Sequence, residues 1–239
     1  MKILLIKCLE DPFSTNPIHP PLGLQYLAAS LEKNGHEVEI IDLRVEKNWR
    51  KTLKNSVLST NIVGLNVQTQ NLKYVLAVSN IIKELDPYIP LVIGGPHCIF
   101  SQFKSLNDIP NADISVTGEG EHVINDIVRF FQGFKKLSDI NGIYYREKGR
   151  IKKGKPLKII KNLDSINFPA RHLVEKYDYG KINNFHMFKP KLTAMITSRG
   201  CPYKCNFCTR YNNIIKDWSF RQRSAENVVK EIIVIYDYN

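Results

Sequence analysis

The chain has 239 residues, 43% of them hydrophobic, which is enough for a core within one large or two small domains. The opening apolar run of four residues is shorter than a signal-peptide core and far shorter than a membrane span, so we expect neither a secretory nor a membrane segment. The five cysteines, three of them clustered, predict metal ligation in a reducing compartment, and we expect a cytoplasmic protein.

Strand and helix patterns alternate over the first half of the chain. Apolar runs predict strands at Lys2–Lys7, Glu37–Asp42, Ile62–Val67, Leu91–Gly94 and Ala112–Thr117. Helical patterns lie between them at Leu22–Asn34, Lys47–Leu58 and Leu72–Asp86, with a further helix from near Glu121 to Phe131. Gly35 and Pro87 are typical of residues just past a helix end. The alternation predicts an α/β fold, a doubly wound parallel sheet that binds ligands at the carboxyl ends of its strands.

The loops expected at those carboxyl ends are rich in glycine, proline and polar residues. They are His19-Pro20-Pro21-Leu22-Gly23-Leu24, Gln68-Thr69-Gln70-Asn71, Gly94-Gly95-Pro96-His97 and Gly118-Glu119-Gly120-Glu121. Together they predict a wide pocket floor on one edge of the sheet. The first loop lacks the G-x-G-x-x-G pattern of a dinucleotide site, and the sequence has no P-loop, so neither nucleotide site is predicted.

The excess positive charge lies in the second half of the chain. Residues 1–120 carry 11 Lys+Arg against 12 Asp+Glu, whereas residues 121–239 carry 23 against 11. Much of the excess surrounds Tyr145–Lys153, which predicts a surface hairpin with Lys148-Gly149 at its turn. A solvated basic hairpin is the simplest interpretation, and contact with an anionic substrate, an acidic reductase or RNA is the alternative.

The pattern divides the chain into three parts, at residues 1–132, 133–190 and 191–239. The middle part contains the hairpin and a linker that includes Asn162–Arg171, which we interpret as a packed connector. In the last part, Leu192–Ser198 predicts a short buried strand, and Ala225–Tyr236 predicts a helix with Ser224 as its N-cap. A cysteine-rich loop lies between that strand and that helix.

This loop holds Cys201, Cys205 and Cys208 at C-x3-C-x2-C spacing. Three thiolates can hold three irons of a cubane cluster and leave the fourth open, whereas ordinary clusters and structural zinc sites use four protein ligands. Two alternatives remain, a zinc site completed by Cys8, Cys98 or a histidine, and a disulfide with one spare thiol. The nearby charges of Arg199 and Lys204 are interpreted as solvated, with tuning of the cluster potential or contact with anionic groups as the alternative.

The cysteine spacing resembles that of the radical S-adenosylmethionine (SAM) enzymes. The resemblance implies that the cysteines bind a 4Fe-4S cluster and that SAM chelates the open iron. One electron, supplied by a flavodoxin- or ferredoxin-type donor, then cleaves SAM to a 5′-deoxyadenosyl radical. It also places Phe207 near the adenine, although a hydrophobic lid over the cluster would explain this residue equally. Residues 191–239 would be the incomplete start of a β/α barrel, so this fragment alone is expected to be inactive.

The glycine-rich loops of the first part resemble the cobalamin-binding domain of one radical SAM subfamily. The resemblance implies a Rossmann-like (flavodoxin-like) domain over residues 1–132. The corrin contacts it implies are Pro21, Leu22, Gly23, Thr69, Gln70, Gly94, Gly95, Pro96, His97, Gly118, Glu119, Gly120 and Glu121. No histidine stands in a D-x-H-x-x-G motif, so cobalt is expected to lack a lower ligand from that motif. His97 is therefore interpreted as a pocket residue or a structural one.

The resemblance implies a cobalamin-dependent radical SAM enzyme that transfers a methyl group to an unactivated carbon or phosphorus of a small molecule or peptide. The first alternative is a radical SAM enzyme that performs a cyclisation or rearrangement and has a non-cobalamin first domain. The second is a non-catalytic zinc- or RNA-binding protein. Nucleic acid is not expected as a partner of the enzyme.

Overall fold

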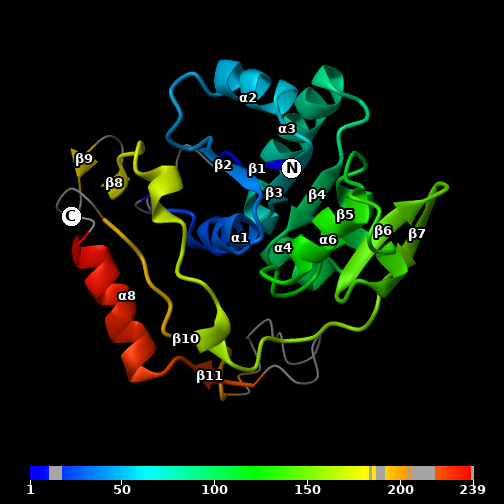
Figure 1. The fold of residues 1–239 in the computed structure, drawn as a ribbon. Helices are drawn as coiled ribbons and strands as arrows, with labels where there is room; N and C mark the ends of the chain where they lie inside the picture. The colour runs from blue at the N-terminus through cyan, green and yellow to red at the C-terminus, as the bar shows by residue number, and fades with distance from the viewer. Residues whose placement is uncertain (11–17, 183–184, 187–191, 204, 206–218, 238–239) are drawn as a thin grey trace.

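The structure is a computed structural model that describes residues 1–10, 18–182, 185–186, 192–203, 205 and 219–237. Its main sheet has seven strands in the order β2-β1-β3-β4-β5-β6-β7 (Figure 1). Strands β1 to β5 pair in parallel, and β6 and β7 are antiparallel to their neighbours. The predicted α/β fold with a doubly wound parallel sheet is confirmed.

The observed elements follow the predicted order. The strands are β1 (Lys2–Lys7), β2 (Glu37–Asp42), β3 (Ile62–Asn66), β4 (Leu91–Gly94), β5 (Ile114–Val116), β6 (Ile143–Glu147) and β7 (Arg150–Lys153). The helices are α1 (Leu22–Lys33), α2 (Trp49–Leu58), α3 (Leu72–Leu85), α4 (Pro96–Ser101), α5 (Lys104–Asp108) and α6 (Val123–Phe131). The short helices α4 and α5 were not predicted, because fewer than two helical turns give no clear periodicity.

Both faces of the sheet are buried, as the apolar strands require. Along β1, Ile3 and Leu5 face one hydrophobic cluster, to which α1 and α6 contribute, whereas Leu4 and Ile6 face a second cluster, to which α2 and α3 contribute. Successive side chains of a strand point to opposite faces, so one continuous apolar run supplies both clusters. Among the described residues, no helix is long and apolar enough to cross a membrane.

The strand order creates a switch point between β1 and β3. The chain leaves β1 to form β2 on one side and then returns to form β3 on the other side. Loops that leave the carboxyl ends of β1 and β3 therefore diverge to opposite faces. In open α/β sheets this divergence opens the crevice in which ligands bind.

The basic hairpin extends the main sheet. Its turn residues Lys148 and Gly149 have φ values of 50° and 75°, as a tight two-residue hairpin turn requires, so the turn prediction is confirmed. Strand β6 pairs with β5 and buries Ile143 and Tyr145, whereas β7 is mostly exposed. The hairpin is thus a surface feature only along β7.

The linker packs along α1 and the end of β2, which confirms the prediction of a packed connector. The backbone N–H of Ala170 donates to the carbonyl of Gln25 in α1 at 3.1 Å. The hydroxyl of Tyr179 donates to the buried carboxylate of Asp42 at 3.2 Å. The linker contains the 3-10 turns η3 (Leu163–Ser165) and η4 (Arg171–Val174), and ends in the small hairpin β8 (Lys181–Ile182) and β9 (Phe185–His186).

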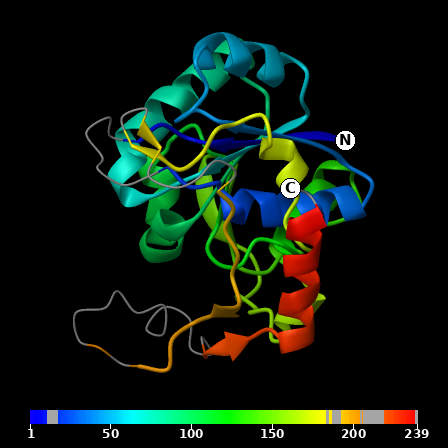
Figure 2. The ribbon, with the colours of Figure 1, turned by 90° about the vertical axis from the view of Figure 1, so that its left-hand side faces the viewer.

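The last part contains a two-stranded ladder and one helix. The ladder is formed by β10 (Ser198–Arg199) and β11 (Arg221–Gln222), and the helix is α8 (Ala225–Asp237). Both views place these elements on the opposite side of the sheet from α2 and α3 (Figure 2). The N-cap prediction is confirmed, because the Ser224 hydroxyl accepts a hydrogen bond from the backbone N–H of Asn227 at 3.1 Å.

The predicted buried strand Leu192–Ser198 is wrong. Residues 192–197 have no regular structure and are half-buried or exposed, and pairing begins only at Ser198. A strand needs a neighbour to satisfy its backbone groups. Within the described part of the chain, β11 is the partner of this segment and spans only two residues.

Candidate functional site

The loops at the carboxyl edge of the sheet are shaped by close backbone contacts. Gly95 has a φ of 114°, and a Cβ added there would lie 2.7 Å from the carbonyl oxygen of Val67. Only glycine lets β4 turn into α4 against the end of β3 in this way. By contrast, Gly23 faces open space, and Thr69 and Gln70 are exposed. The edge therefore presents polar groups and unobstructed backbone beside the switch point.

Pro21, Leu22, Gly94 and Pro96 belong to the same edge. Pro21 is buried, whereas the other three are half-buried. Pro21 immediately precedes α1, and Pro96 is the first residue of α4. A proline at a helix start leaves no unpaired N–H there, so the chain enters each helix in a fixed direction.

His97 is turned into the protein. Its Nδ1 lies 3.2 Å from the Thr69 hydroxyl and its Nε2 lies 3.0 Å from a carboxylate oxygen of Asp108. Both ring nitrogens are therefore engaged by protein groups, and the side chain is buried. Of the two interpretations of His97, this geometry supports the structural one.

Two leucine side chains cover the glycines of the loop after β5. A Cβ added at Gly118 would lie 2.1 Å from a methyl of Leu157, and one added at Gly120 would lie 2.8 Å from a methyl of Leu27. Larger residues at either glycine would displace these leucines. The loop backbone is thereby held close to the linker and to α1.

The carboxylate of Glu119 is buried and surrounded by donors. It accepts hydrogen bonds from the backbone N–H of Ile160 at 2.7 Å and from both terminal nitrogens of Arg221 at 2.9 Å, and a terminal nitrogen of Arg199 lies 3.3 Å away. Burial opposes ionisation of this carboxyl, but the hydrogen bonds from Arg221 and Ile160 and the charge of Arg199 outweigh it and hold its pKa below the ordinary value.

Arg199 is not a solvated loop charge, so that interpretation is wrong. Its side chain is 15% exposed, and it pairs with Glu119 and, at 2.5 Å, with Glu121. Its guanidinium also lies over the ring of Tyr26, 5.4 Å from the centroid. Burial opposes the charge of Arg199, but the two carboxylates outweigh it and raise the pKa of the guanidinium. The sequence could not show these pairs, because Glu119 and Glu121 lie about 80 residues earlier in the chain and only the fold brings them to Arg199.

The two ends of the cysteine loop, the segment between β10 and β11, meet at a narrow base. Gly200 has a φ of 87°, and a Cβ added there would lie 2.3 Å from the carbonyl oxygen of Ser219. Cys201 and Cys205 are exposed. Phe207 and Cys208, like Lys204, lie outside the described residues. In the described ranges no three His, Cys, Asp or Glu side chains gather as a metal site, so the cluster assignment stays a prediction.

The other two cysteines lie in the core of the sheet. Cys8 and Cys98 are fully buried within the cluster that α2 and α3 cover. Burial raises the pKa of both thiols to about 12. Metals bind the thiolate form, so these thiols are poor candidates for a fourth zinc ligand.

A second buried charge cluster was not predicted from the sequence. Glu231 of α8 is fully buried and accepts hydrogen bonds from Arg171 of the linker and from Arg223. Arg171 also donates to the carbonyl of Ala194, and Arg223 to that of Ile196. These three charges thus hold α8, the linker and the segment before the cysteine loop together. The sequence gives only a weak signal for this cluster, because Glu231 is one of three acidic residues in α8.

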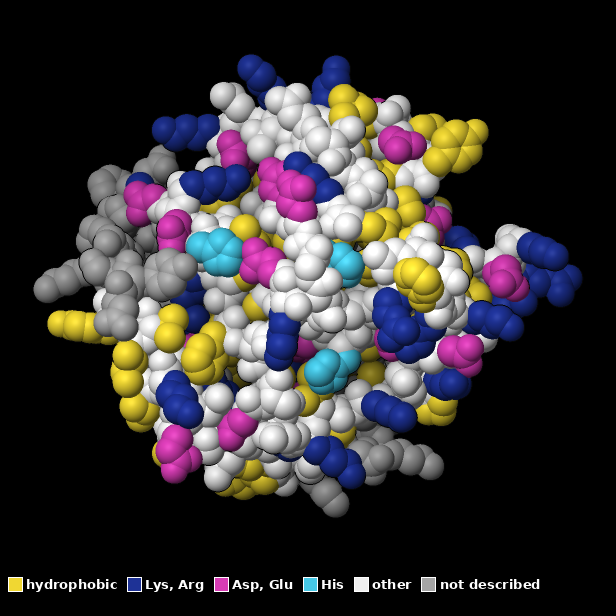
Figure 3. Space-filling model, in the orientation of Figure 1, with side chains coloured by type: hydrophobic (Ala, Val, Ile, Leu, Met, Phe, Trp, Pro, Cys, Tyr) yellow, Lys and Arg dark blue, Asp and Glu magenta, His cyan; other side chains and the backbone are white. Residues whose placement is uncertain are grey.

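Lys and Arg side chains alternate with acidic side chains on the face of the molecule that Figure 3 shows. Lys and Arg side chains are spread over this face and gather at the projecting hairpin, with acidic side chains among them (Figure 3). There, for example, Lys152 pairs with Glu147. The distribution on this face is that of a solvated surface rather than a continuous basic stripe.

Comparison with known proteins connects these features. Residues 14–128 match the B12 binding domain family. An uncharacterized methyltransferase of Pyrococcus horikoshii is 31% identical over 224 residues, which cover 92% of this chain and 46% of that protein. The chain contains a B12-binding domain and is similar over most of its length to cobalamin-dependent radical SAM enzymes. The matched domain contains the parallel strands β2 to β5 and the loops at their carboxyl ends.

Two further relatives bear on the family. The anaerobic magnesium-protoporphyrin IX monomethyl ester cyclase of Rubrivivax gelatinosus is 29% identical, over 90% of this chain and 39% of that enzyme. The cobalamin-dependent SAM radical enzyme OxsB, solved with aqua-cobalamin and SAM bound, has a TM-score of 0.75 at 23% identity, over 98% of this chain and 31% of that one. At that identity OxsB shows the shared fold. The chain spans less than half the length of these family members.

Proposed function

We propose that this protein acts as a cobalamin-dependent radical SAM enzyme. One observation carries the proposal: the ends of the cysteine loop are tied by Arg199 and Arg221 to the loop after β5. That loop lies at the carboxyl edge of the sheet in the matched B12-binding domain. This geometry supports a cluster site and a corrin site on the same edge of the sheet.

The residues present suit both cofactors. Cys201, Cys205 and Cys208 offer three soft thiolate ligands, and at least the first two are exposed as an entering cluster requires. The open backbone at Gly23 and the polar exposed residues Thr69 and Gln70 suit the amide-rich rim of a corrin. When bound, the cluster supplies the electron that splits SAM, and the corrin carries the methyl group. Phe207 is proposed as the adenine neighbour.

The remaining corrin contacts are proposed in order along the edge. Pro21 and Leu22 accompany Gly23 at the start of α1, and Gly94, Gly95 and Pro96 follow β4. His97 supports the loop after β3 through Thr69. Gly118 and Gly120 are proposed to border the corrin site from beneath Leu157 and Leu27, while Glu119 pairs with Arg199 and Arg221 and Glu121 pairs with Arg199. The parts 1–132, 133–190 and 191–239 are proposed as the corrin domain, the hairpin with linker, and the start of the radical domain.

Methyl transfer is the proposed reaction. The Pyrococcus horikoshii relative is a methyltransferase by name, which supports it. The Rubrivivax gelatinosus relative is a cyclase, so cyclisation is the second candidate. The proposed substrate is a small molecule or peptide, and the proposed reductant is a flavodoxin- or ferredoxin-type protein.

The test is an anaerobic titration of the purified protein with hydroxocobalamin, followed by corrin absorption and by reconstitution with iron and sulfide. We expect saturable corrin binding with a base-off spectrum and about four irons per chain. A Cys201→Ala, Cys205→Ala, Cys208→Ala variant serves as the matched control, which should keep corrin binding and lose the iron. Folded protein that binds no corrin, or that binds zinc in place of iron, contradicts the proposal.

A further inference from the structure

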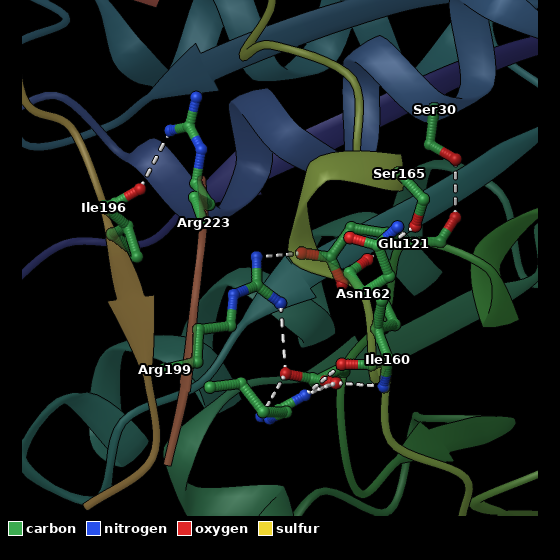
Figure 4. Close-up of polar contacts among 10 residues, drawn as sticks. Ser30, Glu121, Ile160, Asn162, Ser165, Ile196, Arg199 and Arg223 are labelled. Atoms are coloured by element: carbon green, nitrogen blue, oxygen red, sulfur yellow. Dashed lines mark hydrogen bonds and ion pairs between the residues drawn. The ribbon is translucent and has the colours of Figure 1, made fainter. Parts of the chain in front are cut away.

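Four buried charges join the cysteine loop to the first domain. Glu119 and Glu121 belong to the loop after β5, and Arg199 and Arg221 stand at the two ends of the cysteine loop. We call these four residues the charge clamp. Figure 4 shows Arg199 extended from its strand toward the side chain of Glu121.

Every member of the charge clamp is largely withdrawn from water. The exposed fractions of the side chains are 4% for Glu119, 8% for Glu121, 15% for Arg199 and 7% for Arg221. Glu119 contacts both arginines, at 3.3 Å and 2.9 Å, and therefore bridges the two ends of the loop. A bidentate contact between planar guanidinium and carboxylate groups fixes direction as well as distance.

The other described contacts at the loop base include the short β10–β11 ladder and hydrogen bonds from Arg221 to the carbonyl of Ile160 and from Arg223 to that of Ile196. The β10–β11 ladder spans two residues per strand, and residues 192–197 before it pair with no described strand. A ladder this short is marginal alone. Buried ion pairs add little net stability compared with apolar groups of the same volume, but they select one geometry when both partners are present. The charge clamp is therefore the contact that sets the orientation of the loop base relative to the loop after β5.

The loop after β5 has two functional surfaces. Its glycines, Gly118 and Gly120, belong to the proposed corrin edge, whereas its alternate residues Glu119 and Glu121 face the cysteine loop. A segment of four residues thus links the proposed corrin edge to the base of the cysteine loop.

We propose that Glu119 and Glu121 are positioning residues that fix the cysteine loop, and with it the cluster, relative to the corrin edge. This inference rests on the proposed function for the identity of the two cofactors. The geometric part concerns the apoprotein and is tested without either cofactor.

The first experiment is hydrogen exchange of the apoprotein, followed by mass spectrometry. In a Glu119→Gln, Glu121→Gln double variant, the amides of β10 and β11 should exchange at least about tenfold faster, because each lost carboxylate leaves a buried guanidinium uncompensated. The amides of β1 to β4 should exchange as in the wild type. Glu147→Gln is the matched control, since it removes a carboxylate that pairs with Lys152 on the exposed hairpin. Exchange of the ladder within about twofold of the wild type overturns the proposal.

Two single variants keep the test decisive if the double variant does not fold. Arg199→Gln removes the charge, and Arg199→Lys keeps the charge but loses the forked geometry. We expect Arg199→Gln to speed exchange of the ladder and Arg199→Lys to restore part of the protection. Equal protection in wild type and Arg199→Gln contradicts the inference.

The second experiment measures geometry in protein loaded with both cofactors. Electron paramagnetic resonance reports the magnetic coupling between cob(II)alamin and the reduced cluster. The coupling should be uniform in the wild type and weaker or more broadly distributed in the Glu119→Gln, Glu121→Gln variant. Unchanged coupling in the loaded variant overturns the positioning role. A wild type that takes up neither cofactor refutes the proposed function, while the exchange result still decides whether the charge clamp holds the loop.

Discussion

Replacing Gly95 by alanine tests the close approach of β4 to β3 at the proposed corrin edge. Gly95 precedes α4 with φ 114° and ψ −174°, a conformation that is essentially confined to glycine. The added Cβ would lie 2.7 Å from the carbonyl oxygen of Val67 and 3.0 Å from the amide nitrogen of Asn66. The first of these contacts is with backbone, which cannot rotate away.

The expected cost follows from these two effects. A non-glycine residue in this backbone region costs about 1–3 kcal/mol, and the contact with Val67 adds to it, so we expect Gly95→Ala to lower the free energy of unfolding by about 3 kcal/mol. If the free energy of unfolding falls by about 3 kcal/mol for each molar of urea, the urea midpoint of unfolding decreases by about 1 M.

The assay is equilibrium urea unfolding followed by far-ultraviolet circular dichroism. Gly23→Ala is the matched control, because its Cβ meets nothing within 4 Å and the residue lies in the first turn of α1. Alanine there should raise the midpoint by about 0.2–0.3 M, since glycine costs roughly 0.5–1 kcal/mol in a helix. A Gly95→Ala protein with the wild-type midpoint and slope would refute the reasoning, because both the strain and the contact would then be absent.

Glu231→Gln should lower the free energy of unfolding of the α8 region by about 3 kcal/mol, because the substitution leaves two buried arginines without a carboxylate partner. Faster limited proteolysis at α8 is the expected result, and an unchanged cleavage rate contradicts the prediction. The Glu119 carboxyl has a folded pKa below its ordinary 4.5, so its contribution to stability should be present above that pH and lost as pH falls through the folded pKa. Thermal melts from pH 6 to 3 should therefore show a smaller loss for Glu119→Gln than for the wild type. Iodoacetamide should label the exposed Cys201 at pH 8 but not Cys8 or Cys98 in the native protein, because burial raises the pKa of both core thiols to about 12. Rapid labelling of Cys8 or Cys98 would contradict their burial.

The sheet could be predicted from the sequence because its signals are local. The continuous apolar run of β1 supplies both hydrophobic clusters, and the Gly35 and Pro87 signals mark helix ends to within a few residues. The turn at Lys148-Gly149 is likewise a property of adjacent residues. The strand prediction for residues 192–197 was wrong because strand formation there is not a local property. An apolar run becomes a strand only when another strand pairs with it.

The sequence by itself determined the α/β class, the positions of the strands and longer helices in the first half of the chain, and the three-cysteine motif that indicates a cluster with one open iron. Only the tertiary structure decided where the base of the cysteine loop lies relative to the B12-binding domain. Glu119 and Arg221 are about 100 residues apart in the chain, and no local pattern pairs them. A buried charge is tolerated only beside an opposite charge, and the packing of the whole chain determines which residue supplies that charge.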